Sequence, residues 1–198
     1  MNSPQEFQSN LKEGYEIRLM SGPEFGPLFN EYRQKLFAED LMFQPSDACS
    51  PDELEKVDLL RKNFKDIVRI RLGLYFENHF VGWSWGYQQD VETFYMCNSA
   101  VFPEHRRKGL YTALLERIMK EAMDLGFQRL VSRHNTTNNA VIIPKLKAGF
   151  VITQLEVSEI FGTLVHLCFY PNDARNKVMK FRSGQMRPDA EINRLLKL

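Results

Sequence analysis

The chain has 198 residues, of which 43% are hydrophobic and 26% are charged, and its formal net charge is +1 at pH 7. This length predicts one domain with a sizeable core, or one domain and a tail. The small net charge does not favour nucleic acid or a membrane surface as a partner. No apolar run approaches the ~20 residues of a membrane span. The three cysteines are far apart and include no Cys-x-x-Cys pair, so neither a disulfide framework nor a metal site is predicted.

The N-terminal segment predicts a flexible start followed by a strand and a helix. Residues 1–14 are polar and lack the apolar segment of a secretory signal, so a reducing cytoplasm is the expected location. Residues 15–20 alternate between polar and apolar side chains, as a half-buried strand does. Ser21 is followed by Gly22 and Pro23, which is typical of a helix N-cap and first turn. Apolar residues then repeat at helical spacing as far as Leu36.

A second helix is predicted after a loop at residues 38–50. Ser50 and Pro51 are followed by two acidic residues, which is a strong helix start. The loop is apolar at residues 41–43, and its acidic residues Glu39, Asp40 and Asp47 either attract a cationic amine or are ordinary solvated side chains. The side of this helix expected to be buried consists of Leu54, Val57, Leu59, Leu60 and Phe64.

The remaining pattern predicts a sheet with two more helices. One helix is expected from about Arg107 to Gly126, with Leu110, Leu114, Ile118, Ala122 and Leu125 on one apolar face. Another begins near Asn138 and contains Pro144, which should keep it short. A strand on each side of the first helix makes a βαβ unit with parallel strands. The strands are expected at residues 67–76, 80–87, 93–102, 127–132, 151–157 and 164–170.

The stretch from Ser99 to Thr112 carries the clearest functional pattern. A strand breaks at Pro103, and a basic loop with Gly109 leads into the long helix. The N-terminus of a helix presents free N–H groups and a partial positive charge, which suits a phosphate or diphosphate. Gly109 has no Cβ, so the backbone there can approach an anion closely.

Two motifs resemble the GNAT superfamily, the acyl-CoA-dependent N-acetyltransferases. Arg106-Arg107-Lys108-Gly109-Leu110-Tyr111 is similar to the family signature Arg/Gln-x-x-Gly-x-Gly/Ala, and it follows a Val-x-Pro-like turn. Asn138 and the pair Gly149-Phe150 match a second family pattern. Tyr111 departs from the small residue of the signature. Lys145 stands where many members have a tyrosine that protonates the leaving thiolate, so the usual general acid is absent.

The resemblance implies an α/β fold of the α+β mixed-sheet type. This GNAT acyl-CoA N-acyltransferase fold is mostly antiparallel, with the fourth and fifth strands parallel and splayed. It is expected over residues 15–170, and residues 171–198 form a basic C-terminal extension. That extension either packs as a helix near Ile192 or contacts an acidic partner.

The resemblance also implies where acetyl-CoA, the expected co-substrate, is held; no metal is expected. The pantetheine arm should bond to the backbone near Ala100, Val101 and Phe102, like an added strand. The diphosphate should lie on N–H groups at residues 107–111. The side chains and backbone expected around it belong to Arg106, Arg107, Lys108, Gly109, Leu110, Tyr111, Thr112 and, from the other side, Asn138.

The implied reaction is direct acetyl transfer from the thioester to a primary amine of a small molecule or protein. His134, just past the fifth strand, is one candidate base, because histidine titrates near neutral pH. Tyr95 is another; it is predicted to share a strand face with Cys97 and Ser99. The N–H near Val101 is a candidate oxyanion donor. A non-catalytic CoA-binding or interaction module remains the alternative, and a homodimer is possible.

Overall fold

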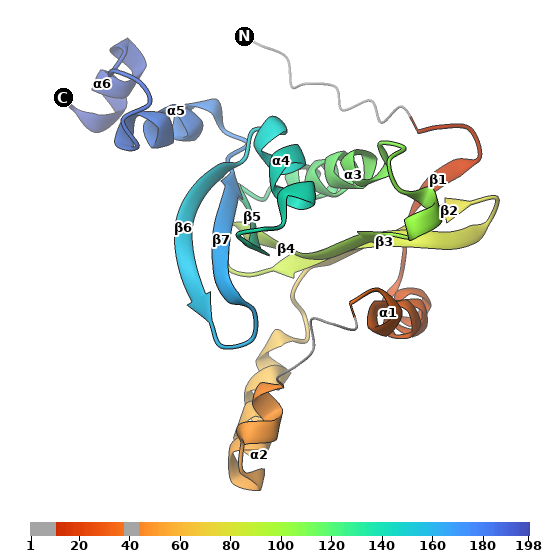
Figure 1. Ribbon diagram of the computed structural model, residues 1–198. Coiled ribbons are helices and arrows are strands. Elements are labelled where there is room, and N and C mark those ends of the chain that lie inside the picture. The colour runs from red at the N-terminus through yellow and green to blue at the C-terminus, as the bar shows by residue number, and fades with distance from the viewer. Residues whose placement is uncertain (1–10, 38–43) are drawn as a thin grey trace.

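A computed structural model describes residues 11–37 and 44–198, and its centre is one seven-stranded sheet (Figure 1). The strand order is β1-β2-β3-β4-β5-β7-β6. Neighbouring strands are antiparallel except β4 and β5, which run parallel and confirm the predicted mixed sheet. The strands are β1 (Tyr15–Leu19), β2 (Arg69–Phe76), β3 (His79–Gln88), β4 (Thr93–Val101), β5 (Arg129–Asn135), β6 (Val151–Ser158) and β7 (Gly162–Phe169).

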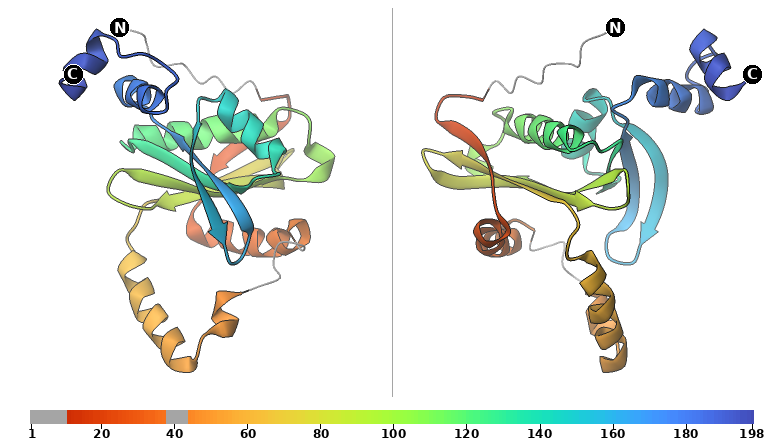
Figure 2. Two further views of the ribbon diagram at one scale, coloured as in Figure 1. Left: turned by 60° about the vertical axis from the view of Figure 1, so that its left-hand side comes forward. Right: turned by 180° about the vertical axis from the view of Figure 1, so that it is seen from behind.

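The helices lie on both sides of this sheet. Helices α3 and α4 cover one face and α1 lies against the other, whereas α2 projects away from the sheet (Figures 1 and 2). Ser21 and Ser50 are the N-caps of α1 and α2, as predicted, and each also forms a capping box with a glutamate three residues later. The α-helices are α1 (Gly22–Leu36), α2 (Pro51–Arg61), α3 (Leu110–Asp124), α4 (Asn139–Lys147), α5 (Asp173–Arg182) and α6 (Ala190–Leu196). Short 3₁₀ turns are η2 (Pro45–Ala48), η3 (Lys62–Phe64) and η4 (Pro103–His105).

The larger core lies between the sheet and α3. Leu114, Ile118 and Ala122 on α3 are 0% exposed and pack with Leu72 and Phe94 of the sheet. The predicted apolar face of α3 is therefore confirmed for these positions. It is wrong for Leu125, which is 60% exposed because the helix ends at Asp124 and the chain turns away at Gly126.

A smaller aromatic core lies between the sheet and α1. Trp83 is fully buried among Phe25 and Phe29 of α1. Its indole Nε1 donates a 2.7 Å hydrogen bond to the side-chain carbonyl of Asn98. A buried indole N–H needs such a partner. Trp83 is thus a core residue.

The predicted buried side of α2 is wrong. Leu59 and Leu60 are 53% and 63% exposed, and no residue of the helix is buried. The apolar spacing predicts a helix, but spacing cannot say whether another element packs against it. Residues 38–43, which include the apolar positions 41–43 and the acidic Glu39 and Asp40, lie outside the described residues.

Leu59→Ala is expected to change the free energy of unfolding by less than about 0.5 kcal/mol, because an exposed leucine loses little burial. Leu114→Ala, the matched core variant, should cost about 2–5 kcal/mol. Urea titration of both variants measures the difference. A large loss at Leu59 would mean that α2 is packed against something in solution.

The C-terminal extension is folded and attached to the sheet. Arg175 of α5 makes two 2.9 Å contacts with the carboxylate of Glu92, which precedes β4. Ile192 of α6 is fully buried, and Lys177 joins the two helices through Glu191 at 2.6 Å. The packed-helix alternative is therefore confirmed, with α6 placed where the sequence indicated.

Strands β4 and β5 form a fork. They pair only from Thr93↔Arg129 to Tyr95↔Val131, although both continue for several residues. At this point the register between β3 and β4 shifts, so that Cys97 is an extra residue in β4. Such a bulge bends its strand and increases its twist. The bulge therefore accounts for β4 leaving β5 after Tyr95.

The bulge also corrects a prediction about strand faces. Ser99 hydrogen-bonds at 2.8 Å to Ser84. Ser84 lies on β3 between Gly82 and Gly86, which are on the face that packs against α3. Tyr95 instead lies on the α1 face, because it alternates with Phe94 of the α3 core. An extra residue in a strand reverses the faces that follow it. Tyr95 and Ser99 thus do not share a face.

Candidate active site

The basic loop leads into α3 through two residues with left-handed backbone. Arg107 has φ of 60° and Gly109 has φ of 79°, and α3 begins at Leu110 rather than near Arg107 as predicted. Left-handed residues cannot continue a right-handed helix, which explains the later start. Gly109 is the N-cap and no atom lies within 4 Å of where its Cβ would be. Space in front of the helix end is therefore open.

The N–H groups in front of α3 are not used by the protein. Arg106 N–H donates to Pro103 and Ala113 N–H donates to Gly109. Between them, in the part of the chain that the structure describes, residues 107–112 donate no backbone hydrogen bond. Unpaired N–H groups at a helix N-terminus form an anion-binding end. These unpaired N–H groups of residues 107–112, called the cradle below, are therefore available to an anion.

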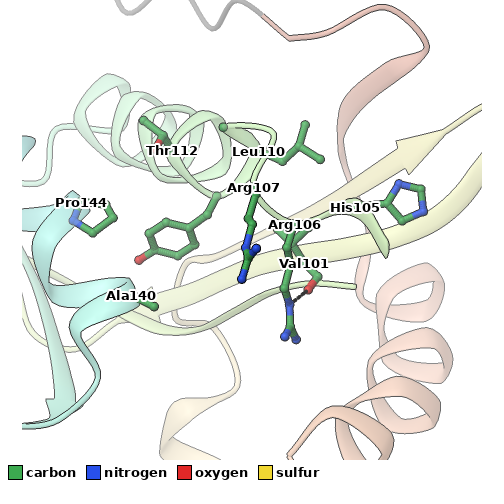
Figure 3. Close-up of a pocket in the computed structure, with 10 residues that line it drawn as sticks. Val101, His105, Arg106, Arg107, Leu110, Thr112, Ala140 and Pro144 are labelled. Carbon is green, nitrogen blue, oxygen red and sulfur yellow. Dashed lines mark hydrogen bonds between the residues drawn. The ribbon is translucent and has the colours of Figure 1, made fainter. Parts of the chain in front are cut away.

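A pocket of about 180 Å³ lies over this helix end, between α3 and α4 (Figure 3). Ligand sites for drug-sized molecules span ~300–1,000 Å³, so this pocket matches one part of a long ligand. It is lined by Val101, His105, Arg106, Arg107, Gly109, Leu110, Tyr111, Thr112, Ala140 and Pro144.

The three basic side chains of the loop have different surroundings. Arg106 Nε donates a 2.9 Å hydrogen bond to the Val101 carbonyl, so it holds the loop against β4 (Figure 3). Arg107 lines the pocket and is exposed. Lys108 donates instead to the Tyr15 hydroxyl at 2.9 Å, and His105 contacts the same hydroxyl. Arg107 is therefore the cation best placed to face a bound anion.

Residues at the start of α3 line the pocket in different ways. Leu110 is 2% exposed, and its side chain belongs to the core. Thr112 is exposed, and its hydroxyl is accessible to a ligand. Burial raises the pKa of the Tyr111 hydroxyl well above its ordinary value. Tyr111 thus stays neutral, and its ring packs against the core.

Beyond the fork, the backbone N–H and C=O groups of β4 point alternately toward β3 and toward the open side. Phe102 N–H donates to Val81 of β3, so that donor is occupied. Backbone groups alternate in direction along a strand, which turns the N–H of Val101 toward the gap. The Val101 carbonyl accepts from Arg106, and Ala100 is 8% exposed. Among these three residues, the N–H of Val101 is the donor that faces the fork.

Helix α4 borders the pocket through Ala140 and Pro144. Asn138 is its N-cap but is exposed, caps nothing with its side chain and does not line the pocket. A contact from Asn138 to a ligand therefore stays a prediction.

On the α3–α4 face of the fork, His134 belongs to a buried polar group. Its Nε2 lies 2.9 Å from Ser132 Oγ, and Ser132 Oγ accepts a 2.7 Å hydrogen bond from Lys145 Nζ. Burial, and then the charge of Lys145, lowers the pKa of His134 to about 3. An imidazole with so low a pKa is a weak base. The burial of Lys145 was missed from the sequence, where lysine in a helix indicates a solvated position.

Tyr95 lies on the opposite face of the sheet from His134. Its hydroxyl accepts a 3.3 Å hydrogen bond from Arg133, and its ring stacks edge-on against Tyr87. Burial raises the pKa of Tyr95, although Arg133 opposes this. Burial also raises the pKa of the neighbouring Cys97 thiol to about 11, so the thiol is not a ready nucleophile. The two candidate bases, His134 and Tyr95, lie on opposite faces of the sheet. They therefore cannot act on the same substrate atom from the same side.

No helix in the described ranges, 11–37 and 44–198, has the length and hydropathy of a membrane span. No group of three or more His, Cys, Asp or Glu side chains there is arranged to hold a metal ion.

The sequence profile of the Acetyltransferase (GNAT) family matches residues 30–150. The chain therefore belongs to the GNAT acetyltransferase family. No curated protein gave a significant match to the sequence.

Solved structures show the same fold at low identity. The yncA protein of Salmonella typhimurium, solved with its cofactor acetyl-CoA, has a TM-score of 0.58 and 18% identity over 81% of this chain and 95% of its own. The ribosomal-protein-S18-alanine N-acetyltransferase of Escherichia coli has a TM-score of 0.55 and 15% identity over 80% and 94%. A chimeric spermidine N-acetyltransferase from Vibrio cholerae and hSSAT has a TM-score of 0.58 and 17% identity over 80% and 96%.

Proposed function

We propose that this protein transfers the acetyl group of acetyl-CoA directly to a primary amine of a small molecule or a protein. The observation that carries the proposal is the set of unpaired N–H groups at residues 107–112, in front of α3 and beside Arg107. The diphosphate of CoA has the charge and size for this cradle. We place the reaction in residues 15–170, in the cytoplasm, with residues 171–198 as an extension.

The fork supplies the second half of the site. The N–H of Val101 faces the gap between β4 and β5, where an extended pantetheine arm can pair with it as an added strand does. The thioester then lies near the point where the strands separate, and the same N–H group is a candidate oxyanion donor. The acceptor amine must lose a proton before it attacks. His134 and Tyr95 stay predictions for that step.

Acetyl-CoA at about 100 times its dissociation constant should stabilise the fold by about 2.7 kcal/mol, roughly 5–10 °C in Tm for a domain of this size. NAD at the same concentration, which has a diphosphate but no thioester arm, should produce little shift. Thermal denaturation with each ligand makes the comparison. If acetyl-CoA produced no shift in Tm, the protein would not bind the cofactor, and the proposed reaction would be wrong.

The reaction itself is tested by incubating the protein and acetyl-CoA with a panel of polyamines, amino acids and amine-bearing peptides. Release of free CoA thiol, dependent on one class of amine, is the expected result. Structurally similar proteins act on spermidine and on a ribosomal-protein alanine, according to their names, so the panel needs both kinds of acceptor.

The alternative is a non-catalytic CoA-binding or protein-interaction module. The small pocket, with the bulky Tyr111 in its lining, favours it. Clear binding of CoA with no thiol release across the whole panel would support this alternative.

A further inference from the structure

Lys145 is a buried lysine without an acidic partner. It lies on α4 with 2% of its surface exposed. Its Nζ donates to Ser132 Oγ at 2.7 Å, lies 3.6 Å from Met96 Sδ, and sits 5.0 Å from the centre of the Phe150 ring. In the described ranges of the chain, no carboxylate lies within salt-bridge distance of it. A buried amine in such surroundings is costly to keep charged.

The position of this amine coincides with the opening of the fork. The last paired residues of β4 and β5 are Tyr95 and Val131. Met96 and Ser132, the two contacts of Lys145 Nζ, are the next residue of each strand. The amine thus bridges the two strands where they part, on the face covered by α3 and α4. The thioester position of the proposed function, near the point where the strands separate, is therefore next to Lys145.

Ser132 links Lys145 to His134. The Lys145 N–H donates to Ser132 Oγ, which leaves the hydroxyl hydrogen free to be donated to His134 Nε2, 2.9 Å away. The imidazole proton then lies on Nδ1. His134 is a titratable side chain close enough to feel the charge of Lys145, whereas Tyr95 and Cys97 lie on the other face of the sheet. The chain Lys145–Ser132–His134 therefore fixes Nζ in one place.

Burial lowers the pKa of Lys145 to about 7. The pKa of His134, about 3, keeps that imidazole neutral at ordinary pH. The group of this cluster that gains and loses a proton near neutral pH is therefore the lysine. A pKa near the working pH is the property that a general acid needs.

Resting on the proposed function, we propose that Lys145 is the acid that protonates the departing CoA thiolate, with Ser132 and His134 as positioning residues. The acceptor nitrogen forms a bond to the thioester carbonyl carbon, and the C–S bond breaks with its electron pair on sulfur. A proton moves from Lys145 Nζ to that sulfur and leaves a neutral amine. The acceptor nitrogen releases one proton to solvent, and solvent returns one to Lys145.

The test measures the thiol of bound CoA, so it needs no acceptor. The ultraviolet absorbance of the thiolate is followed against pH for CoA bound to an excess of the wild type, Lys145→Met or Lys147→Met. Methionine keeps the length of the apolar stem, and Lys147 is the exposed control on the same helix. An ammonium within reach lowers the thiol pKa by ~1–3 units. We expect the thiol to titrate at least about one pH unit lower in the wild type and Lys147→Met than in Lys145→Met.

A second measurement requires no variant. Nitrogen NMR of the Lys145 amine, with and without CoA, should show its titration rising by the same amount, because coupled sites shift each other equally. This measurement stands even where Lys145→Met fails to fold.

The outcomes separate the two proposals. CoA that binds without any difference in thiol titration between the wild type and Lys145→Met overturns the role of Lys145 and leaves the proposed function standing. CoA that does not bind the wild type overturns both. An acetyl group found on Lys145 by mass spectrometry after incubation with acetyl-CoA also overturns the assignment, because a lysine that keeps the acetyl group acts as a nucleophile.

Discussion

Replacing Lys145 with methionine is expected to stabilise the protein by about 4 kcal/mol at pH 7. Burial lowers the pKa of Lys145 from its ordinary value of 10.5 to about 7. Between these two pH values the unfolded chain binds more protons than the folded one, so the stability of the wild type rises with pH. The variant lacks this dependence. The difference between the two proteins should therefore shrink above pH 7 and vanish near pH 10.5.

Urea denaturation at several pH values in this window measures the effect. His134 does not interfere, because its pKa falls from 6.5 to about 3 and its contribution is confined to more acidic conditions. Lys147→Met, at an exposed position on the same helix, should change stability by less than about 0.5 kcal/mol. Equal stability of the wild type and Lys145→Met at pH 7 would show that the lysine is not buried as a costly charge.

A Cβ at position 109 is expected to weaken acetyl-CoA binding at least about tenfold, which corresponds to about 1.4 kcal/mol. Gly109 has a left-handed φ and forms part of the cradle in front of α3. The Cβ of Gly109→Ala would occupy the space through which an anion approaches the N–H groups. The backbone strain of an alanine there adds a stability cost of about 1–2 kcal/mol.

Gly126→Ala is the matched control for this variant. Gly126 lies at the other end of α3, has φ of 95°, and has no atom within 4 Å of its missing Cβ. Its alanine should carry the same strain cost but leave acetyl-CoA affinity unchanged. Calorimetric titration of both variants with acetyl-CoA separates the two effects. Equal affinities would place the diphosphate elsewhere.

Local signals in the sequence predicted much of the fold. Ser21 and Ser50 each have a glutamate three residues later, and both make the capping boxes that start α1 and α2. The alternation of apolar and polar residues predicted strands, because such alternation indicates burial on one face of a sheet. These signals depend on residues close together in the chain, and so they can be read without the tertiary structure.

The predictions from sequence were wrong where residues far apart in the chain determine the local structure. The bulge at Cys97 depends on the register between β3 and β4, and it moved Ser99 to the other face. The exposure of Leu60 on α2 depends on what packs against that helix. The later start of α3 follows from the left-handed Arg107, which the sequence does not mark.

The candidate site also has one part that could be predicted from the sequence and one part that could not. Gly109 and the basic residues before α3 could be recognised, since they form one continuous motif. The cluster of Lys145, Ser132 and His134 joins α4 to β5 and has no motif in the sequence. A lysine that looks solvated in a linear pattern became the most deeply buried charge near the fork.

The cradle before α3 is built from main-chain atoms, and this has a consequence for divergence. Amides are common to every residue type except proline, so a site made from them survives the replacement of nearly all side chains around it. Only positions that need a left-handed backbone, such as Gly109, restrict which residue types are tolerated. The Salmonella protein, which has the same fold, shares 18% of its residues with the chain.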